Sequence, residues 1–310
     1  MLSVFPTLQF TPELLPFIRE QFRQLSVPPP HESADEVQVE ELFITSRHDA
    51  HQIRLLVYRP LSEGEEPRPG VLHIHGGGYV IGSPELNDAR NRLLCRELGL
   101  VIVSVAYRLA PEWAFPVPQE DCYAALQWMH TEAPQLGIDR RAMALYGQSA
   151  GGGLAAAVAI MARDRGEVTV AHQVLIYPML DDRTCVDPAP NPHAGEYIWT
   201  RASNLFGWTA LLGHAPGQAD VSPYASPARV EDLTGLPPTY IAVGALDLFL
   251  DENMAYARRL LMAGVATELH VYPGAFHGFD TAGLPATLIE QFKLDEQRAF
   301  WRAFGQKMLH

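Results

Sequence analysis

The chain is poor in cysteine: its 310 residues include only Cys95, Cys122 and Cys185, which lie far apart. Their odd number, their separation and the absence of any C-x-x-C spacing favour free thiols in a reducing compartment. No apolar run approaches the roughly 20 residues that a membrane-spanning helix needs, and the mean hydropathy is −0.04. Residues 1–6 lack the basic start and long apolar core of a signal peptide. We therefore expect a cytoplasmic protein without membrane partners.

Basic residues are also in the minority. The chain carries 23 Lys and Arg against 36 Asp and Glu, a formal net charge of −13. A surface of this sign repels phosphate backbones, so we expect no nucleic-acid partner. Neither a P-loop motif nor an H-E-x-x-H motif occurs. His73 and His75 could face one side of a strand, but no further ligands join them, so no metal site is expected.

Segments with strand patterns alternate with helical ones along most of the chain, and apolar residues make up 47 % of it. This length and composition suit one large α/β domain with a sizeable core. Strands are expected at residues 37–45, 52–59, 70–75, 100–106, 142–146, 170–177, 239–243 and 267–272. Helices are expected at residues 11–25, 87–98, 120–132, 154–166, 251–263 and 284–304. The alternation predicts a mainly parallel eight-stranded sheet with helices on both faces.

Two segments stand apart from this alternation within the single domain of residues 1–310. A triple proline follows the first helix and reads as a linker, so about residues 1–35 look like an appendage. Pro16 argues that this first helix begins later than residue 11. Residues 178–227 are rich in proline, aspartate and aromatic residues. We interpret them as an inserted, partly helical cap.

The most informative stretch is Gly147-Gln148-Ser149-Ala150-Gly151, which has the form G-x-S-x-G. It lies between an apolar strand-like run and an alanine-rich helix-like run, the setting of a nucleophile elbow. Glycines at both ends leave room where a Cβ atom would collide with neighbouring backbone. The free N–H groups of the following helix can face a developing anion. An ordinary glycine-rich turn has the same short pattern, so other residues must decide.

A nucleophilic serine needs a base, and the base needs an orienting acid. His277 lies in a loop directly after a predicted strand, where it can reach over the carboxyl edge of the sheet, although a plain surface-loop histidine is the alternative. Asp247 ends a predicted strand among apolar neighbours that would bury it beside an imidazole. Asp251 instead suits the cap of the next helix. We therefore expect Ser149, Asp247 and His277 to be the catalytic residues.

A tetrahedral intermediate also needs N–H donors for its oxyanion. Gly77 and Gly78 can bring two backbone amides close to an oxygen because no side chain intervenes, and Ala150 supplies a third. The rival interpretation of these glycines is a dinucleotide-binding loop. The spacing of Gly76, Gly78 and Gly82 misses G-x-G-x-x-G by one residue, which argues against that interpretation.

The chain resembles the bacterial hormone-sensitive-lipase-like family of α/β-hydrolase carboxylesterases over nearly its whole length. The blocks that carry the resemblance occur in the family's order: His75-Gly76-Gly77-Gly78, Tyr107-Arg108-Leu109-Ala110-Pro111-Glu112, Gly147-Gln148-Ser149-Ala150-Gly151-Gly152, Asp247 and His277-Gly278-Phe279.

The resemblance implies an α/β-hydrolase fold and a triad of Ser149, Asp247 and His277. It also implies an oxyanion hole from Gly77, Gly78 and Ala150, a helical cap built from about 1–35 and about 178–227, and a homodimer through the edge strand at residues 267–272 as one option.

Two positions depart from the family's usual pattern. Gln148 stands where the family usually has Asp, and Leu248-Phe249 follows Asp247 where Pro-Leu is usual. Loss of a carboxylate beside the oxyanion hole is expected to alter the substrate range, and it removes no triad member.

We predict a carboxylic-ester hydrolase that works through an acyl-enzyme, requires no cofactor and takes a small-molecule ester. Aromatic residues are expected to wall a closed apolar pocket that suits short to medium acyl or aryl esters. These residues are Tyr197, Trp199, Phe206 and Trp208 of the insert, with Phe17 and Phe22 of the first helix. An amidase or acyltransferase with the same triad stays open. A non-catalytic ligand-binding relative, such as the plant gibberellin receptors, would be expected to have a spoiled triad.

Overall fold

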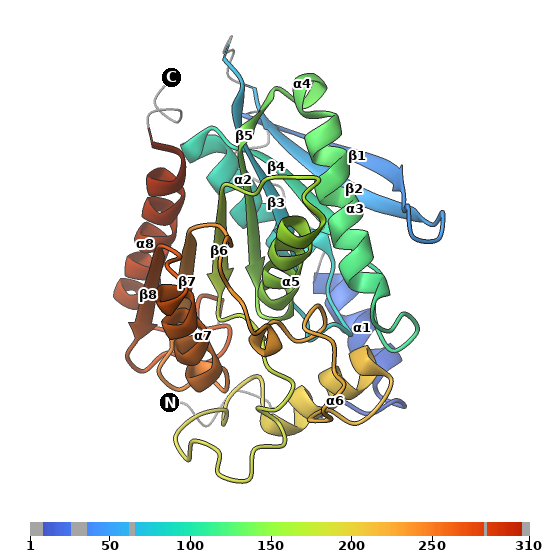
Figure 1. Cartoon of the computed structure of the whole chain (residues 1–310), viewed down its shortest axis with the longest axis vertical. Helices are drawn as coiled ribbons and strands as arrows, with labels where there is room; N and C mark the ends of the chain where they lie inside the picture. The colour runs from blue at the N-terminus through green and yellow to red at the C-terminus, as the bar shows by residue number, and fades with distance from the viewer. Residues whose placement is uncertain (1–8, 26–35, 62–65, 282–283, 306–310) are drawn as a thin grey trace.

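The computed structural model describes residues 9–25, 36–61, 66–281 and 284–305 (Figure 1). These residues form one eight-stranded sheet in the order β1-β2-β4-β3-β5-β6-β7-β8. Its strands are β1 (Val37–Thr45), β2 (Gln52–Pro60), β3 (Arg68–Ile74), β4 (Val101–Ala106), β5 (Ile138–Gln148), β6 (His172–Ile176), β7 (Thr239–Gly244) and β8 (Thr267–Tyr272). The pairings β1–β2 and β2–β4 are antiparallel and all others are parallel. The predicted mainly parallel eight-stranded sheet is confirmed.

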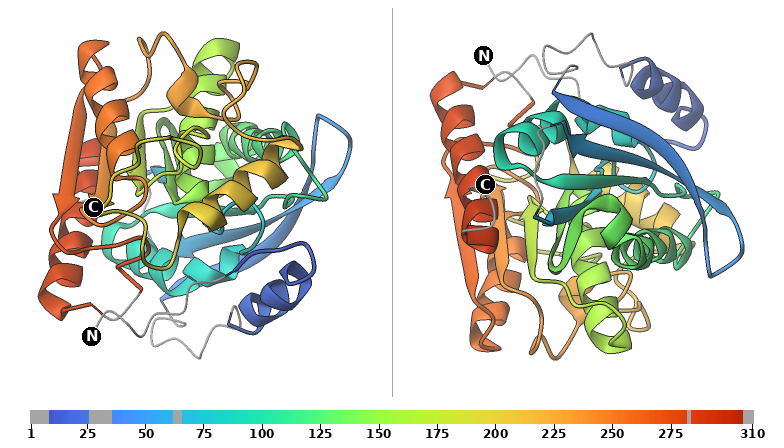
Figure 2. Two further views of the ribbon diagram at one scale, coloured as in Figure 1. Left: turned by 90° about the horizontal axis from the view of Figure 1, so that it is seen from below. Right: turned by 90° about the horizontal axis from the view of Figure 1, so that it is seen from above.

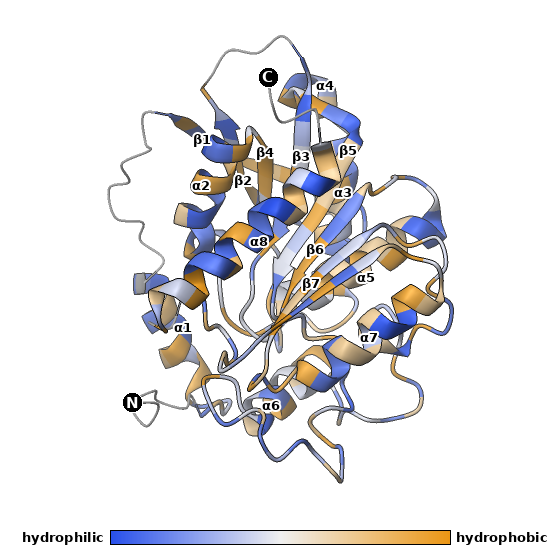
Figure 3. Ribbon diagram, turned by 90° about the vertical axis from the view of Figure 1, so that its left-hand side faces the viewer, coloured by the Kyte–Doolittle hydropathy of each residue, from blue (hydrophilic) through white to orange (hydrophobic). Residues whose placement is uncertain are grey.

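Helices cover both faces of the sheet, as the alternation predicts (Figure 1). The helices are α1 (Leu15–Leu25), α2 (Asp88–Leu98), α3 (Val117–Thr131), α4 (Ala133–Leu136), α5 (Ala150–Arg165), α6 (Arg201–Leu212), α7 (Leu250–Met262) and α8 (Ala286–Phe304). Helices α3, α5 and α7 pack one apolar core against the sheet, while α2 and α8 pack a second core on the other face. In Figure 3, polar and apolar segments alternate along α7 and α8, as expected of helices with one face on a sheet.

Several element boundaries differ from the sequence predictions by a few residues, and the largest of these differences are at the starts of α1, β5 and α5. Helix α1 begins at Leu15 after a turn, which agrees with the argument from Pro16. Strand β5 begins at buried Ile138, earlier than residue 142. The sequence did not indicate this start because the next residues, 139–141, are polar and at least partly exposed and carry no apolar pattern. Helix α5 begins at Ala150 rather than near 154, because its early glycines are needed for close packing. A Cβ atom on Gly151 would lie 2.0 Å from the carbonyl oxygen of Ile74.

Helices α1 and α6 lie together beyond the carboxyl ends of the parallel strands (Figures 1 and 2). A small apolar cluster joins them to the segment after β3. Its buried members are Leu15, Ile18, Val80, Ile81, Ala110 and Ala210. Two segments that are far apart in sequence therefore meet at the edge of the sheet where the serine-bearing turn is located. Residues 28–35, expected as a linker, lie outside the described residues.

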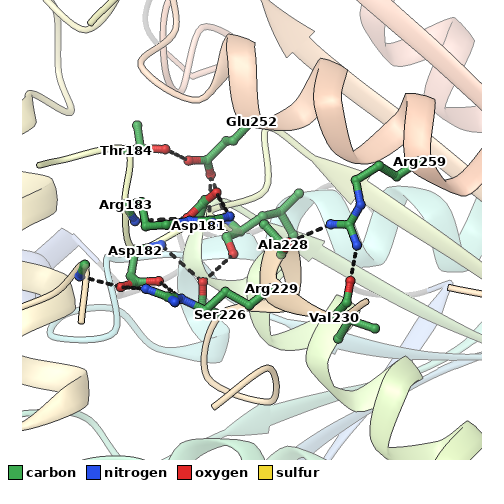
Figure 4. A network of polar contacts seen from close by, with 12 residues as sticks. Asp181, Asp182, Arg183, Thr184, Ser226, Ala228, Arg229, Val230, Glu252 and Arg259 are labelled. Atoms are coloured by element: carbon green, nitrogen blue, oxygen red, sulfur yellow. Dashed lines mark hydrogen bonds and ion pairs between the residues drawn. The ribbon is translucent and has the colours of Figure 1, made fainter. Parts of the chain in front are cut away.

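Buried polar contacts hold the two ends of segment 178–227 side by side (Figure 4). Arg229 donates to both carboxylate oxygens of Asp182, at 2.6 and 2.9 Å, and Asp182 is fully buried. The hydroxyl of Ser226 donates to the carbonyl of Leu180 at 3.1 Å. Glu252 of α7 accepts from the amide of Leu180 at 2.7 Å. Glu252 thus ties the start of the segment to α7, and the Asp182–Arg229 ion pair ties the start to the residues just after the end. Removing one partner of this buried pair would leave an uncompensated charge.

The three cysteines are buried and unpaired. No helix among the described residues is both long and apolar enough to span a bilayer. The described part of the chain also holds no group of three or more His, Cys, Asp or Glu side chains suited to a metal ion.

Candidate active site

Ser149 lies on a sharp turn between β5 and α5. Its backbone has φ 56° and ψ −123°, a region that side-chain-bearing residues rarely adopt. The turn is possible only because glycines flank it: a Cβ atom on Gly147 would lie 2.2 Å from the carbonyl oxygen of Gly151. Hydrogen bonds from the amide of Ser149 to Ile176 and from the amide of Met179 to Ser149 fix the turn against the segment after β6. The turn thus has the geometry of a nucleophile elbow.

The structure brings Ser149, His277 and Asp247 into one hydrogen-bonded line. The Oγ of Ser149 lies 2.8 Å from Nε2 of His277, and Nδ1 of His277 lies 2.9 Å from Oδ2 of Asp247. The other carboxylate oxygen of Asp247 accepts from the amide of Phe249 at 2.9 Å. Asp247 is fully buried, and the other two side chains are nearly so. This arrangement can transfer the serine proton to an imidazole whose other nitrogen is held by a carboxylate.

Asp251, the alternative acid, lies elsewhere. It is exposed in the first turn of α7, four residues beyond Asp247. Among the described residues, no hydrogen bond or ion pair joins it to His277.

The glycines expected to line the oxyanion hole lie next to the elbow. An added Cβ on Gly76 would lie 3.3 Å from the Cβ of Ser149. Gly77 has φ +121° and Gly78 has φ +58°, and a Cβ on either would come within about 2 Å of its neighbours: 2.1 Å from the carbonyl oxygen of Ile81 and 2.0 Å from the Trp199 ring. Both positions therefore require glycine, because a side chain would strain the backbone at these φ values and would collide with neighbouring atoms.

Arg19 of α1 ties the first helix to this glycine loop. Its Nε donates to the carbonyl of Val80 at 2.8 Å, and its Nη2 donates to the carbonyl of Ala110 at 2.8 Å. Its guanidinium also forms a two-point ion pair with Glu112 at 2.7 and 2.8 Å. Because the amides of Val80 and Ile81 both donate to the carbonyl of Gly77, fixing Val80 also fixes the turn that carries the glycines.

The aromatic residues of the insert occupy different places. The Trp199 ring lies against Gly78 and 6.3 Å from the His277 ring, and Asn204 holds its indole N–H at 3.2 Å. Phe206 of α6 stacks on Phe10, with ring centres 5.8 Å apart. Phe10 also contacts Trp199 at 5.5 Å. These three rings form a continuous aromatic wall beside the glycine loop.

Other expected pocket residues lie farther from this wall. Tyr197 packs on Phe276, with ring centres 5.4 Å apart, and Trp208 is fully buried against Tyr79. Phe22 packs against the α1 cluster. Phe17 is 64 % exposed, so the expectation that it walls a closed pocket is wrong. Phe10, which precedes the helix, was missed because a single aromatic residue outside any periodic pattern gives no signal in the sequence.

Gln148 faces a buried imidazole. Its Oε1 lies 3.1 Å from Nε2 of His73, whose Nδ1 lies 2.7 Å from the hydroxyl of Ser104. Burial lowers the pKa of His73 to about 3. The neutral imidazole then donates from Nε2 to the amide oxygen of Gln148 and accepts from Ser104 at Nδ1. His73 is fully engaged, as is His75, which contacts the carbonyl of Gly76 and stacks on Tyr107.

Gln148→Glu is expected to keep the fold and to change how stability depends on pH. When a histidine has a lower pKa in the folded protein than in the unfolded chain, the free energy of unfolding decreases as the pH falls below the pKa of the unfolded state, about 6.5. A carboxylate at Nε2 favours the imidazolium, so it raises the folded pKa of His73 and reduces that loss. The free energy of unfolding, measured with urea between about pH 7 and pH 5, should decrease less steeply with falling pH in the variant than in wild type. The two slopes should differ by up to about 1.4 kcal/mol per pH unit. Equal slopes would contradict this account of the pair.

The comparisons with known proteins agree with the geometry. A family model described as alpha/beta hydrolase fold matches residues 71–281. An ethyl acetate hydrolase of Pseudomonas putida is 32 % identical over 247 residues, which cover 79 % of this chain and 76 % of that protein. An arylesterase of Saccharolobus solfataricus is 32 % identical over 238 residues, which cover 76 % of this chain and 75 % of that protein. A solved structure described as Bacterial Heroin Esterase is 39 % identical, with a TM-score of 0.89 and coverage of 97 % of this chain and 95 % of that chain.

Proposed function

Because this chain belongs to the bacterial hormone-sensitive-lipase-like family of α/β-hydrolase carboxylesterases, we propose that it hydrolyses small carboxylic esters through Ser149, His277 and Asp247. The observation that carries the proposal is the buried line from the serine hydroxyl through the imidazole to the carboxylate, at 2.8 and 2.9 Å.

In the proposed mechanism, His277 takes the proton of Ser149 as the serine oxygen bonds to the acyl carbon. The resulting oxyanion is held by the amides of Gly77, Gly78 and Ala150. His277 returns its proton to the alkoxy oxygen as that C–O bond breaks and the alcohol leaves. A water molecule then repeats the sequence on the acyl-enzyme and releases the acid. Asp247 holds the imidazole and stabilises its cation.

We further propose that α1 and α6, from about 1–35 and about 178–227, form a cap over this site. Support comes from the aromatic wall of Phe10, Trp199 and Phe206, which combines residues of both segments beside the oxyanion glycines. A walled pocket accepts a few methylenes, each worth about 0.8 kcal/mol of burial, and then stops. The substrates proposed are therefore short to medium acyl or aryl esters.

Arg19→Met is expected to flatten the preference for short acyl chains and to lower kcat/KM for the best ester about tenfold. The variant loses the bonds from α1 to Val80, Ala110 and Glu112, so the cap and the glycine loop are no longer held together. Specificity constants would be measured over esters of increasing acyl length, with matched amides to compare esterase and amidase activity.

Arg23→Met is the matched control on the same helix, since Arg23 is exposed and pairs only with Glu20 of its own helix among the described residues. It should keep the wild-type profile. An unchanged profile in Arg19→Met, or best activity on long-chain fats in wild type, would refute the proposed pocket.

We also propose that the protein is cytoplasmic and that it forms a homodimer by pairing through β8. The three unpaired cysteines favour a reducing compartment. Strand β8 is at the edge of the sheet, where unpaired backbone groups can pair with a second copy. Light scattering of the purified protein tests the dimer, and a charge substitution at exposed Val271 should weaken it.

A further inference from the structure

A second carboxylate lies near the catalytic histidine, three residues after it. Asp280 accepts a hydrogen bond from the hydroxyl of Tyr177 at 2.7 Å. The Tyr177 ring packs against the His277 ring in a T-shaped contact, with ring centres 4.8 Å apart and an interplanar angle of 65°. Tyr177 therefore links Asp280 to the imidazole, on a path separate from the bond between His277 and Asp247.

The backbone holds Tyr177 in an unusual conformation to make this contact. Tyr177 follows β6 directly and has φ +36°, in the left-handed region that is costly for a residue with a side chain. Its amide donates to the carbonyl of Ala242 on β7 at 2.6 Å. The neighbouring turn carries Ser149, whose amide donates to Ile176. The conformation of Tyr177 is thus fixed by the same segment that fixes the nucleophile.

Burial raises the pKa of both side chains in the Tyr177–Asp280 pair. Burial raises the pKa of Tyr177, and the charge of Asp280 raises it further, so the hydroxyl keeps its proton and donates. Burial also raises the pKa of the Asp280 carboxyl, while the bond from Tyr177 and the positive charges of Arg90 and His277 oppose that rise. The carboxylate therefore interacts with the charge that His277 acquires during the reaction.

Other charged groups reach this region from different elements. Arg90 of α2 forms an ion pair with Glu296 of α8, which also accepts from the hydroxyl of Tyr146 on β5 at 2.7 Å. On its other sides, His277 faces Asp247, the Ser149 hydroxyl and the ring of Phe249, which packs against it at 5.0 Å. Arg90 is paired with Glu296. Besides Asp247, the carboxylate linked to the imidazole is Asp280, through the hydroxyl and ring of Tyr177.

We propose that Tyr177 and Asp280 are positioning residues for His277. The anchored Tyr177 ring holds the imidazole in line with Ser149, and the Asp280 carboxylate favours the imidazolium formed when His277 takes the serine proton. This inference rests on the proposed function, in which His277 is the base.

Asp280→Asn is the direct test, because asparagine keeps an oxygen acceptor for Tyr177 and removes the charge. Loss of a nearby negative charge makes the imidazolium less favourable, so the base becomes free at lower pH. The acid limb of kcat/KM against pH should move to lower pH by roughly half a unit to one unit. Asp251→Asn, a carboxylate change on an exposed turn of α7, should leave the limb in place.

Tyr177→Phe tests the ring anchor while every carboxylate is kept. It should lower kcat about tenfold with KM nearly unchanged. In the double variant with Asp280→Asn, the loss in kcat should be smaller than the product of the losses in the two single variants, because the two residues act as a unit. An acid limb that stays in place in Asp280→Asn, or a Tyr177→Phe loss that lies only in KM or thermal stability, would overturn the inference. An inactive wild type would instead refute the proposed function.

Discussion

Ser149→Ala is expected to lower kcat/KM for a good ester by about 10⁴-fold or more, to the residual rate that oxyanion binding alone supports. The expected loss is this large because the variant has no atom to form the acyl-enzyme, while Gly77, Gly78 and Ala150 remain. Initial rates of both proteins on one chromogenic ester would measure it.

Ser222→Ala is a suitable control, since the Ser222 hydroxyl caps a turn by accepting from the amide of Tyr224. It should leave the rate close to wild type. If Ser149→Ala retained more than about a hundredth of the wild-type rate with its fold intact, the nucleophile would be another residue.

Asp247→Asn is expected to lower kcat by roughly 10³- to 10⁴-fold, because an amide at this position favours the wrong imidazole tautomer and cannot stabilise the cation. The effect should lie in kcat, since Asp247 is fully buried behind His277 and does not reach the substrate.

The matched change Asp251→Asn should cost less than about tenfold, because this exposed carboxylate only favours the start of α7. Steady-state kinetics of both variants, with circular dichroism to check the fold, would measure the difference. A larger loss in Asp251→Asn than in Asp247→Asn would show that the acid has been wrongly assigned.

Much of the architecture could be predicted from the sequence because its signals are local. Apolar runs and helical periodicity indicated the eight strands and the order of the main helices. Gly147 and Gly151 around Ser149 suggested the elbow, but an ordinary glycine-rich turn has the same short pattern, so the elbow could be expected only together with His277 and Asp247. The residues His277 and Asp247 could be expected because each follows a predicted strand, and parallel strands end at one edge of the sheet.

The remaining features depend on tertiary contacts without a local pattern. Phe10 and Arg19 reach the glycine loop only through the docking of α1. Likewise, Tyr177 and Asp280 meet across 103 residues of chain. The aromatic composition of the insert predicted a wall, but it could not separate Trp199, which borders Gly78, from Trp208, which is buried against Tyr79.

Covalent labelling with a fluorophosphonate, followed by peptide mass mapping, tests the central proposal most directly. A fluorophosphonate bonds to an activated serine and stops there, because its tetrahedral adduct resembles the intermediate of acyl transfer. We expect one adduct per chain, on the peptide that contains Ser149, with loss of esterase activity in step with labelling and no adduct in Ser149→Ala. Ester hydrolysis that continues in fully labelled protein, or an adduct on a different residue, would contradict the account.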